Sequence, residues 1–330
     1  YTTMRLGGPA AHFLEVTSPS QLPDVFTHPE FKDMPIFILG GGSNVVAYDE
    51  GFDGLVLHIT IPGFEILNDD KNTTTIKVGA GESWDETVQA VVEKNLSGIE
   101  CLSKIPGTVG AAPVQNIGAY GQDLADTFVS LEAYDRYASQ FVTLDKDACG
   151  FGYRHSIFRG DSQGRYVITS VTLQLRKTPL QPPFYESLQQ YLTEQKISGF
   201  SPTSLRQAVS AIRADKLPDP SLKPNSGSFF KNAIISQSKL TEIQQRYPAV
   251  KTFSAPDGQV KIPTGWLIEQ CGFKGQLLHG IRIHDKNSLV LINESAASTK
   301  DLIATRDAII HAVEERFGVT IEQEPLPIRI

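Results

Sequence analysis

Apolar residues recur every three to four positions in three stretches of the chain, as on one face of a helix. The first, "GESWDETVQAVVEKNL", begins with Ser83 and Glu86 at the spacing of a capping box. The second, "SPTSLRQAVSAIRADK", stops before Pro218, and the third, "STKDLIATRDAIIHAVEERFG", ends at Gly318. The pattern predicts a helix in each stretch.

Short β-rich apolar runs lie between these stretches. They are "PIFIL" at 35–39, "GLVLHI" at 54–59 and "SLVLIN" at 288–293. Two further runs, "FVTL" from 141 and "YVITSVTLQL" at 166–175, alternate apolar and polar residues, and turn residues lie between them. This alternation is typical of a half-buried strand. This mixed order of helices and strands predicts an α+β fold rather than a regular βαβ array.

The stretch "RKTPLQPPFYESL" has three prolines within seven residues, which interrupt regular structure. A chain of 330 residues is long enough for two or three domains, since domains usually have about 100–200 residues. We therefore expect a domain boundary near residues 177–200.

Composition and charge narrow the classes of partner. The chain is 40% hydrophobic and carries a formal net charge of −7, which argues against wholesale binding to nucleic acid or an anionic membrane. Its three cysteines are far apart, so neither a disulfide framework nor a metal site is expected and a reducing cytoplasm fits. No apolar run is long enough for a membrane span. The expected partner is a small molecule.

Two glycine-rich segments are candidate cofactor loops. In "GGGSN", at 40–44, three glycines after a strand can present main-chain N–H groups to a phosphate, although glycines alone favour a tight turn between strands. Val45 stands where a GxGxxG motif needs glycine. The segment 98–123 has five glycines and two prolines among apolar residues. It suits a flat ring cofactor or, alternatively, a buried connection.

Three polar side chains are candidates for chemistry. Arg154 lies in "FGYRHSIFR" and can hold a carboxylate or form a structural ion pair. Ser228 lies in "PNSGSFFKNA", after a glycine and before two phenylalanines. Glu324 lies with Glu322 near a C-terminal strand, where carboxylates are usually solvated.

Taken in order, "ILGGGSNV", "IPGTVGAAPVQNIGAYG", "FGYRHSIF", "RADKLPDP", "NSGSFFKN" and "GWLIEQCGFKG" resemble the UDP-N-acetylenolpyruvoylglucosamine reductase (MurB) family of bacterial flavoenzymes. The resemblance covers nearly the whole chain. "PPFYESL" resembles the type I subtype, in which a tyrosine loop folds over the substrate diphosphate.

The resemblance implies a two-part FAD-binding fold of the vanillyl-alcohol-oxidase (PCMH) type, followed by an α+β substrate-binding domain. We expect residues 1–60 and 61–200 to form the two FAD-binding subdomains. Residues 201–330 then form the substrate domain, with a C-terminal tail that returns toward the active site.

The implied reaction is the NADPH-dependent reduction of UDP-N-acetylglucosamine enolpyruvate to UDP-N-acetylmuramate in peptidoglycan synthesis. Non-covalent FAD takes hydride from NADPH and passes it to C3 of the enolpyruvyl group. By resemblance, Ser228 donates a proton to C2, while Arg154 and Glu324 stabilise the charge that develops there. A carboxylate would repel that charge, so Glu324 is expected to hold a proton at that moment.

The resemblance also assigns binding residues. Those for FAD are Gly40, Gly41, Gly42, Ser43, Asn44, Pro106, Gly107, Gly110, Asn116, Gly118, Ala119 and Tyr120. Those for the substrate are Tyr185, Lys216, Asn232 and Lys274.

The chain departs from the family pattern at four positions. Ala111 and Ala112 stand where many relatives have serine, Asn287 where a glutamine is common, and Leu326 where an arginine is often found. Any contact that depends on those side chains is therefore in doubt.

Two other functions fit the same residues. One is a flavoprotein of the same superfamily with another substrate, such as an oxidase, and the other is a nucleotide-sugar binding protein without chemistry. For the reductase we expect a cytoplasmic monomer that binds neither nucleic acid nor membrane.

Overall fold

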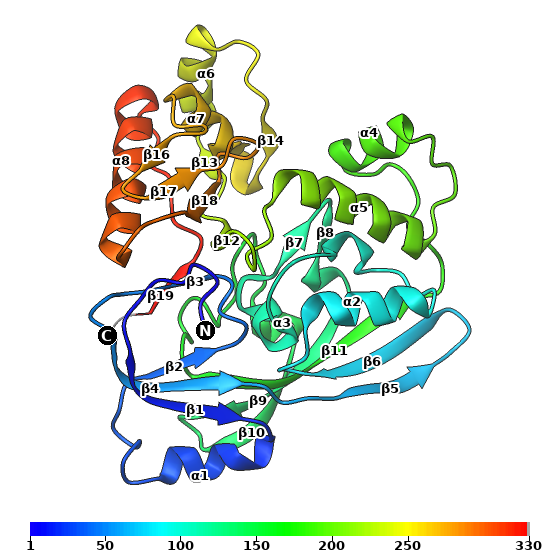
Figure 1. Cartoon of the computed structure of the whole chain (residues 1–330). Helices are drawn as coiled ribbons and strands as arrows, with labels where there is room; N and C mark the ends of the chain where they lie inside the picture. Colours follow the sequence, from blue (N-terminus) through cyan, green and yellow to red (C-terminus); the bar gives the residue numbers. More distant parts are fainter. Residues whose placement is uncertain (329–330) are drawn as a thin grey trace. The chain divides into compact units, whose positions relative to one another are not determined.

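The computed structural model describes residues 1–328, which form two compact units (Figure 1). The larger unit consists of Ala10–Gly42 and Phe52–Ala214. The smaller unit consists of Tyr1–Pro9, Ser43–Gly51 and the chain from Asp215 onward. The chain thus enters the smaller unit three times, so its core is built from separate stretches of sequence.

A three-stranded parallel sheet forms one part of the larger unit. Its order is β1 (Ala10–Val16), β4 (Phe52–Ile59) and β2 (Ile36–Leu39). The short helix α1 (Leu22–Thr27) follows β1. The predicted strands at 35–39 and 54–59 are confirmed as β2 and β4.

A five-stranded antiparallel sheet forms the second part. Its order is β10 (Gln140–Asp145), β9 (Phe128–Asp135), β11 (Tyr166–Arg176), β6 (Thr73–Gly79) and β5 (Phe64–Asp69). The central strand β11 is buried on nearly its whole length, not on one face as its alternation predicts. It lies between β9 and β6 in the sheet, and its register against β9 shifts between Ile168 and Ser170 and between Thr172 and Leu173.

Helix α2 (Trp84–Glu93) packs on this sheet (Figure 1). The Ser83 hydroxyl caps its N-terminus by accepting the Glu86 N–H at 3.4 Å, which is one half of the predicted capping box. The buried Trp84 ring donates its N–H to the Leu102 carbonyl at 3.0 Å. Burying each large apolar side chain of such a stripe contributes about 1.5–3 kcal/mol to stability.

Two further helices of the larger unit pack on each other. They are α4 (Glu186–Glu194), within the proline-rich stretch, and α5 (Pro202–Lys216), which confirms the second predicted helix. Their apolar faces meet around the buried thiol of Cys101. Shorter elements of this unit include α3 (Lys146–Cys149), β7 (Gly118–Ala119) and β8 (Gln122–Asp123).

The smaller unit contains two larger sheets and a strand pair. The first sheet has the order β12 (Asn225–Ser228), β18 (Val290–Asn293), β17 (Ile281–Ile283) and β16 (Leu277–Leu278). The second has the order β13 (Ala233–Ile235), β15 (Val260–Ile262) and β14 (Phe253–Ser254), and the pair is β3 (Val45–Ala47) with β19 (Leu326–Ile328).

Three helices cover these sheets: α6 (Gln237–Arg246), α7 (Thr264–Gln270) and α8 (Thr299–Phe317). Helix α8 lies alongside the sheet that contains β17 (Figure 1). It begins at a capping box of Ser298 and Asp301 and ends at Gly318, whose φ of 61° is left-handed. The third predicted helix is thereby confirmed with both of its ends.

Within residues 1–328, no helix combines the length and the apolar character that crossing a membrane requires. The same residues contain no group of three or more His, Cys, Asp or Glu side chains that could hold a metal ion. Burial raises the pKa of the Cys101 and Cys149 thiols to about 12, so both are unreactive at neutral pH.

Candidate functional site

The loop Gly40–Gly42 follows β2 and packs directly against the second glycine-rich segment. A methyl group on Gly40 would lie 2.6 Å from Thr108 Oγ1, and one on Gly41 would lie 2.9 Å from Gly107 Cα. No Cβ atom fits at such distances, so the close approach of the two backbones requires glycine. Both segments assigned to FAD therefore lie against each other in the larger unit.

Ser43 and Asn44 continue this loop and lead into β3. The Asn44 carbonyl accepts the N–H of Leu326 at 2.9 Å, and β19 runs parallel to β3 from that point. The C-terminal segment thus pairs with the chain that follows the first glycine-rich loop. Leu326, which replaces an arginine common in the family, is a half-buried strand residue here.

The second segment is ordered by short 3-10 turns, Glu100–Leu102 and Val109–Gln115. The fully buried carboxylate of Glu100 accepts hydrogen bonds from the Ser97 hydroxyl and the Gly98 N–H, both at 2.5 Å. Pro106, Gly107 and Gly110 follow it in the chain. A methyl group on Gly110 would lie 2.5 Å from the Cβ of Ala80, the residue that follows β6. The segment therefore also packs tightly against the end of β6.

Asn116 fixes the end of this segment. Its backbone is left-handed, with a φ of 45°, and its side chain is buried. Its Nδ2 donates to the Gly152 carbonyl at 3.2 Å, and its Oδ1 accepts the Ala125 N–H at 3.0 Å. The side chain therefore joins the loop to the segment that carries Arg154.

Arg154 lies at the β7–β8 hairpin. Its Nη2 donates to the Gly118 carbonyl at 2.7 Å, and its own backbone is left-handed, with a φ of 52°. A methyl group on Gly118 would lie 3.0 Å from Arg154 Nη1 and 1.6 Å from Asp123 Oδ1. Arg154, a predicted catalytic residue, therefore contacts Gly118, a predicted FAD-binding residue. Because Gly118 has no side chain, the side chains of Arg154 and Asp123 both fit beside it.

Tyr120 forms the turn of the same hairpin, next to Ala119, with a φ of 48°. Its ring meets the ring of Tyr185 edge to face at 6.1 Å between centroids. Burial raises the pKa of the Tyr120 hydroxyl, which keeps it a neutral hydrogen-bond donor. Tyr185, the N-cap residue of α4, is 44% exposed.

Ser228 ends β12 in the smaller unit, opposite Val290 of β18. Gly227, with a φ of 71°, breaks the strand register just before it. The next two residues, Phe229 and Phe230, are buried and anchor the strand in the core. The backbone of Ser228 is therefore fixed on both sides, as a positioned proton donor requires.

Glu324 lies on the segment beside that anchor. Its N–H donates to the Phe229 carbonyl at 2.9 Å, and Phe230 pairs with Gln323 as a β-bridge. Ser228 and Glu324 are thus carried by neighbouring backbone segments of one unit, although 96 positions separate them in sequence (324 − 228). Arg154 belongs to the other unit.

The predicted substrate residues of the smaller unit are placed as follows. Asn232 Oδ1 accepts the Thr264 N–H at 3.1 Å, which fixes the amide orientation. Lys274 pairs with Glu269 at 3.0 Å, and Glu269 also accepts the Ser288 hydroxyl at 3.3 Å, next to the strand opposite Ser228. Lys216 is the exposed last residue of α5.

Three of the four positions that depart from the family pattern have contacts within the protein. Asn287 Oδ1 accepts the Leu289 N–H at 3.2 Å, so this shorter side chain stabilises its own turn. A methyl group on Gly40 would lie 3.1 Å from the Ala111 methyl, and Ala112 is buried. The two alanines therefore pack within the glycine-rich segments.

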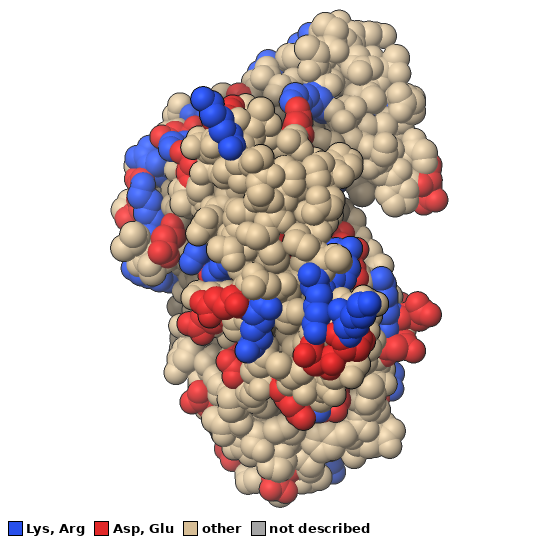
Figure 2. All heavy atoms as spheres, turned by 90° about the vertical axis from the view of Figure 1, so that its right-hand side faces the viewer, with Lys and Arg blue, Asp and Glu red and all other residues tan. Residues whose placement is uncertain are grey.

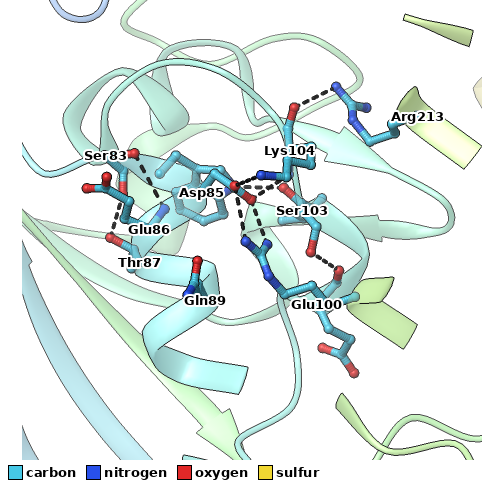
Figure 3. Close-up of polar contacts among 12 residues, drawn as sticks. Ser83, Asp85, Glu86, Thr87, Gln89, Glu100, Ser103, Lys104 and Arg213 are labelled. Carbon is cyan, nitrogen blue, oxygen red and sulfur yellow. Dashed lines mark hydrogen bonds and ion pairs between the residues drawn. The ribbon is translucent and has the colours of Figure 1, made fainter. Parts of the chain in front are cut away.

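Sequence reasoning missed four charged residues in or beside the second segment: Lys104 within it, and Asp85, Arg206 and Arg213. Figure 3 labels Asp85, Lys104 and Arg213. Asp85 binds Arg206 through two hydrogen bonds, of 2.6 and 3.1 Å, and Arg213 donates to the Lys104 carbonyl at 3.1 Å. Asp85, Arg206 and Arg213 lie on helices, where charged residues usually face solvent. Arg213 does belong to the motif "RADKLPDP", but that motif indicates the family and gives the residue no role. On the face drawn in Figure 2, Lys and Arg side chains lie mostly beside Asp and Glu, without an extended basic area.

Comparisons with known proteins cover nearly the whole chain. Residues 10–143 match the family described as FAD binding domain, and residues 219–328 match that described as UDP-N-acetylenolpyruvoylglucosamine reductase, C-terminal domain. A protein of Ralstonia nicotianae named UDP-N-acetylenolpyruvoylglucosamine reductase is 41% identical over 331 residues, which cover 99% of this chain and 96% of that protein. A protein of the same name from Dechloromonas aromatica is 41% identical over 329 residues, with the same coverage.

The fold has a counterpart among solved structures. The crystal structure of UDP-N-acetylenolpyruvylglucosamine reductase (MurB) from Thermus caldophilus aligns with a TM-score of 0.69 and 23% identity. The alignment covers 99% of this chain and 95% of the other. The expected fold class is therefore confirmed.

Proposed function

Because the chain belongs to the UDP-N-acetylenolpyruvoylglucosamine reductase (MurB) family, we propose that it reduces UDP-N-acetylglucosamine enolpyruvate to UDP-N-acetylmuramate in peptidoglycan synthesis. The identity of 41% along 99% of the chain carries this proposal. The two functional segments of the family, the FAD-binding and C-terminal domains, are both present in order.

The residues of the larger unit fit FAD. Gly40 and Gly41 approach Thr108 and Gly107 so closely that a Cβ atom at either glycine would clash, and main-chain N–H groups of such a glycine loop suit the pyrophosphate. Gly118, Ala119 and Tyr120 form the hairpin that we assign to the flavin ring. Bound FAD, held without a covalent bond, supplies hydride transfer from NADPH to C3 of the enolpyruvyl group.

The remaining chemistry falls to three side chains. Hydride addition at C3 sends negative charge toward C2 and the carboxylate of the substrate. Arg154, fixed by the Gly118 carbonyl, stabilises that charge, and a protonated Glu324 stabilises it further. Ser228, on a strand end anchored by buried phenylalanines, gives its proton to C2.

We assign substrate binding to Tyr185, Lys216, Asn232 and Lys274. Lysine ammonium groups attract the diphosphate, and we assign the partly exposed Tyr185, within the proline-rich stretch, as the type I loop tyrosine. The functional domains 1–60, 61–200 and 201–330, the monomeric state and the cytoplasmic location stay predictions.

The test is a two-step colour experiment without oxygen. Purified protein is expected to be yellow, to bleach with NADPH and to regain colour when UDP-N-acetylglucosamine enolpyruvate is added. Recovery only on admitting oxygen would identify an oxidase of the same superfamily. Tight binding of the enolpyruvyl substrate with no bleaching by NADPH would instead identify a non-catalytic binding protein.

A further inference from the structure

Asn225 is a buried polar residue on the strand that carries the predicted proton donor. It is the first residue of β12, and Ser228 is the last. The side chain of Asn225 is only 1% exposed. Asparagine is rarely buried to this extent, and a buried amide is normally held by hydrogen bonds. The partners of this amide therefore indicate what the residue does.

The amide of Asn225 uses both of its N–H hydrogens and its oxygen. Nδ2 donates to the Pro218 carbonyl at 3.1 Å and to the Lys223 carbonyl at 2.7 Å. Oδ1 accepts the Gly227 N–H at 2.8 Å. Carbonyl oxygens can only accept, so the two carbonyls select the orientation in which Oδ1 faces Gly227.

The bond to Gly227 acts on a bulge directly before Ser228. Asn225 pairs with Ile292 and Ser228 with Val290, so two residues of β12 lie opposite one residue of β18. A bulge of this kind bends the strand and re-aims the side chain that follows it. The direction of the Ser228 hydroxyl therefore depends on how the bulge is held.

Hydrogen bonding rather than packing holds this bulge at Gly227. The φ of Gly227 is 71°, which is left-handed. A methyl group placed on it would meet nothing within 4 Å among residues 1–328. Neighbouring atoms thus do not confine Gly227 on that side, whereas the Asn225 amide binds its N–H.

The two Nδ2 bonds attach the same amide to the loop 217–224, which leads from α5 to β12. Within this loop the Asp219 carbonyl accepts the Lys223 N–H at 2.8 Å, so the loop closes on itself. The loop is therefore a compact support against which Asn225 is fixed. An alanine at 225 would remove the contacts with the loop and with the bulge together.

We propose that Asn225 is a positioning residue for the proton transfer to C2, because through the Gly227 N–H it sets the direction of the Ser228 hydroxyl. The proton still passes from Ser228 to C2, and Asn225 donates none itself. This inference rests on the proposed function, since it requires Ser228 to be the proton donor.

The test is a double-mutant cycle of Asn225→Ala and Ser228→Ala in the FAD-containing protein. Stopped-flow absorbance follows colour recovery of the NADPH-reduced protein at saturating UDP-N-acetylglucosamine enolpyruvate. Asn225→Ala is expected to slow recovery about tenfold, because a displaced donor meets C2 poorly. In the Ser228→Ala protein the same substitution is expected to change the rate by less than about twofold, since no donor is left to position. Bleaching by NADPH is expected to stay unchanged throughout.

Asn293→Ala is the matched control. Asn293 ends β18, and its amide also joins two backbone segments. Its Nδ2 donates to the Met4 carbonyl at 3.1 Å, and its Oδ1 accepts the Ala296 N–H at 3.0 Å. Asn293→Ala is expected to lower the melting temperature but to leave colour recovery unchanged.

Asn225→Ser is the conservative variant. A serine hydroxyl can still accept an N–H group two residues further along the chain, although more weakly than an asparagine amide. Its recovery rate is expected to lie between those of the wild type and Asn225→Ala. If Asn225→Ala does not fold, Asn225→Ser takes its place in the cycle under the same criteria.

Recovery at the wild-type rate in Asn225→Ala would overturn the inference alone. Equal slowing by Asn225→Ala with and without the Ser228 hydroxyl would also overturn it, because the residue would then act on the fold or on substrate binding. A wild-type protein that bleaches with NADPH but never recovers colour with the enolpyruvyl substrate would refute the proposed function, and the inference with it.

Discussion

The N–H of Glu324 donates a hydrogen bond of 2.9 Å to the carbonyl oxygen of Phe229. Phe229 follows Ser228 directly, and its N–H in turn donates to Leu289 at 2.7 Å. This backbone pairing places the C-terminal glutamate segment against the strand end that carries the serine. Both candidate groups for the second half of the reaction therefore depend on the same backbone contacts.

Ser228→Ala separates the two half-reactions. Bleaching by NADPH is expected to stay near the wild-type rate, whereas colour recovery with the enolpyruvyl substrate slows by about 10²-fold or more, because the proton donor to C2 is lost. Stopped-flow absorbance measures both rates. The control is Ser226→Ala on the same strand, whose buried hydroxyl has no partner among the described residues and whose loss should leave both rates intact.

Glu324→Gln tests whether Glu324 acts with its proton on. The rate of colour recovery in the wild type is expected to fall as pH rises and the carboxyl ionises. Glutamine is neutral at every pH, so this fall should disappear in the variant. Glu322→Gln is the control. Glu322 lies two residues before Glu324 in the chain, and its carboxylate pairs with the Lys231 ammonium at 2.9 Å. Identical pH profiles for wild type and Glu324→Gln would refute the role.

Gly118→Ala tests the arrangement around Arg154. The new methyl group would lie 1.6 Å from Asp123 Oδ1 and 3.0 Å from Arg154 Nη1, so both side-chain ends must move. Because these ends are flexible, the loss of stability is expected to stay within about 1–3 kcal/mol. Colour recovery with substrate should fall far more than FAD content.

The control for this variant is Gly199→Ala, where a methyl group meets nothing within 4 Å. It is expected to leave melting temperature and both half-reactions unchanged. Equal effects of the two substitutions on colour recovery would show that the space at Gly118 does not matter to Arg154.

Asp85→Asn tests the charge cluster at α2. Burial alone would raise the pKa of Asp85, but hydrogen bonds from Arg206 and Lys104 overcome this and lower it from 3.8 to about 2. The carboxylate therefore stabilises the fold above pH 4, and the contribution is lost as pH falls toward 2. A shift of this size corresponds to roughly 2 kcal/mol at neutral pH.

The measurement is urea unfolding of wild type and Asp85→Asn at several pH values. The wild type should be more stable by roughly 2 kcal/mol at pH 7, and the difference should shrink below pH 4. A difference that does not depend on pH would show that packing, rather than charge, holds Asp85 in place.

The sequence by itself predicted the elements with strong local signals. Helices α2 and α8 have hydroxyl caps and apolar stripes, and β2 and β4 are continuous apolar runs, so their own residues determine them. Strand β5 escaped prediction because it is exposed along its whole length and shows no alternation. The motif around Ser228 also pointed to the family, because a motif consists of residues that are consecutive in the sequence and can be recognised without the fold.

The tertiary structure decided which distant residues meet. Asp85 and Arg206 are 121 residues apart, and any of several carboxylates and arginines could have paired on sequence grounds. The packing of α2 near α5 gives the Asp85 carboxylate to Arg206, whereas Arg213 of the same helix donates to the Lys104 carbonyl. Charge pairing depends on distances of a few ångströms between folded elements, and local sequence does not encode those distances.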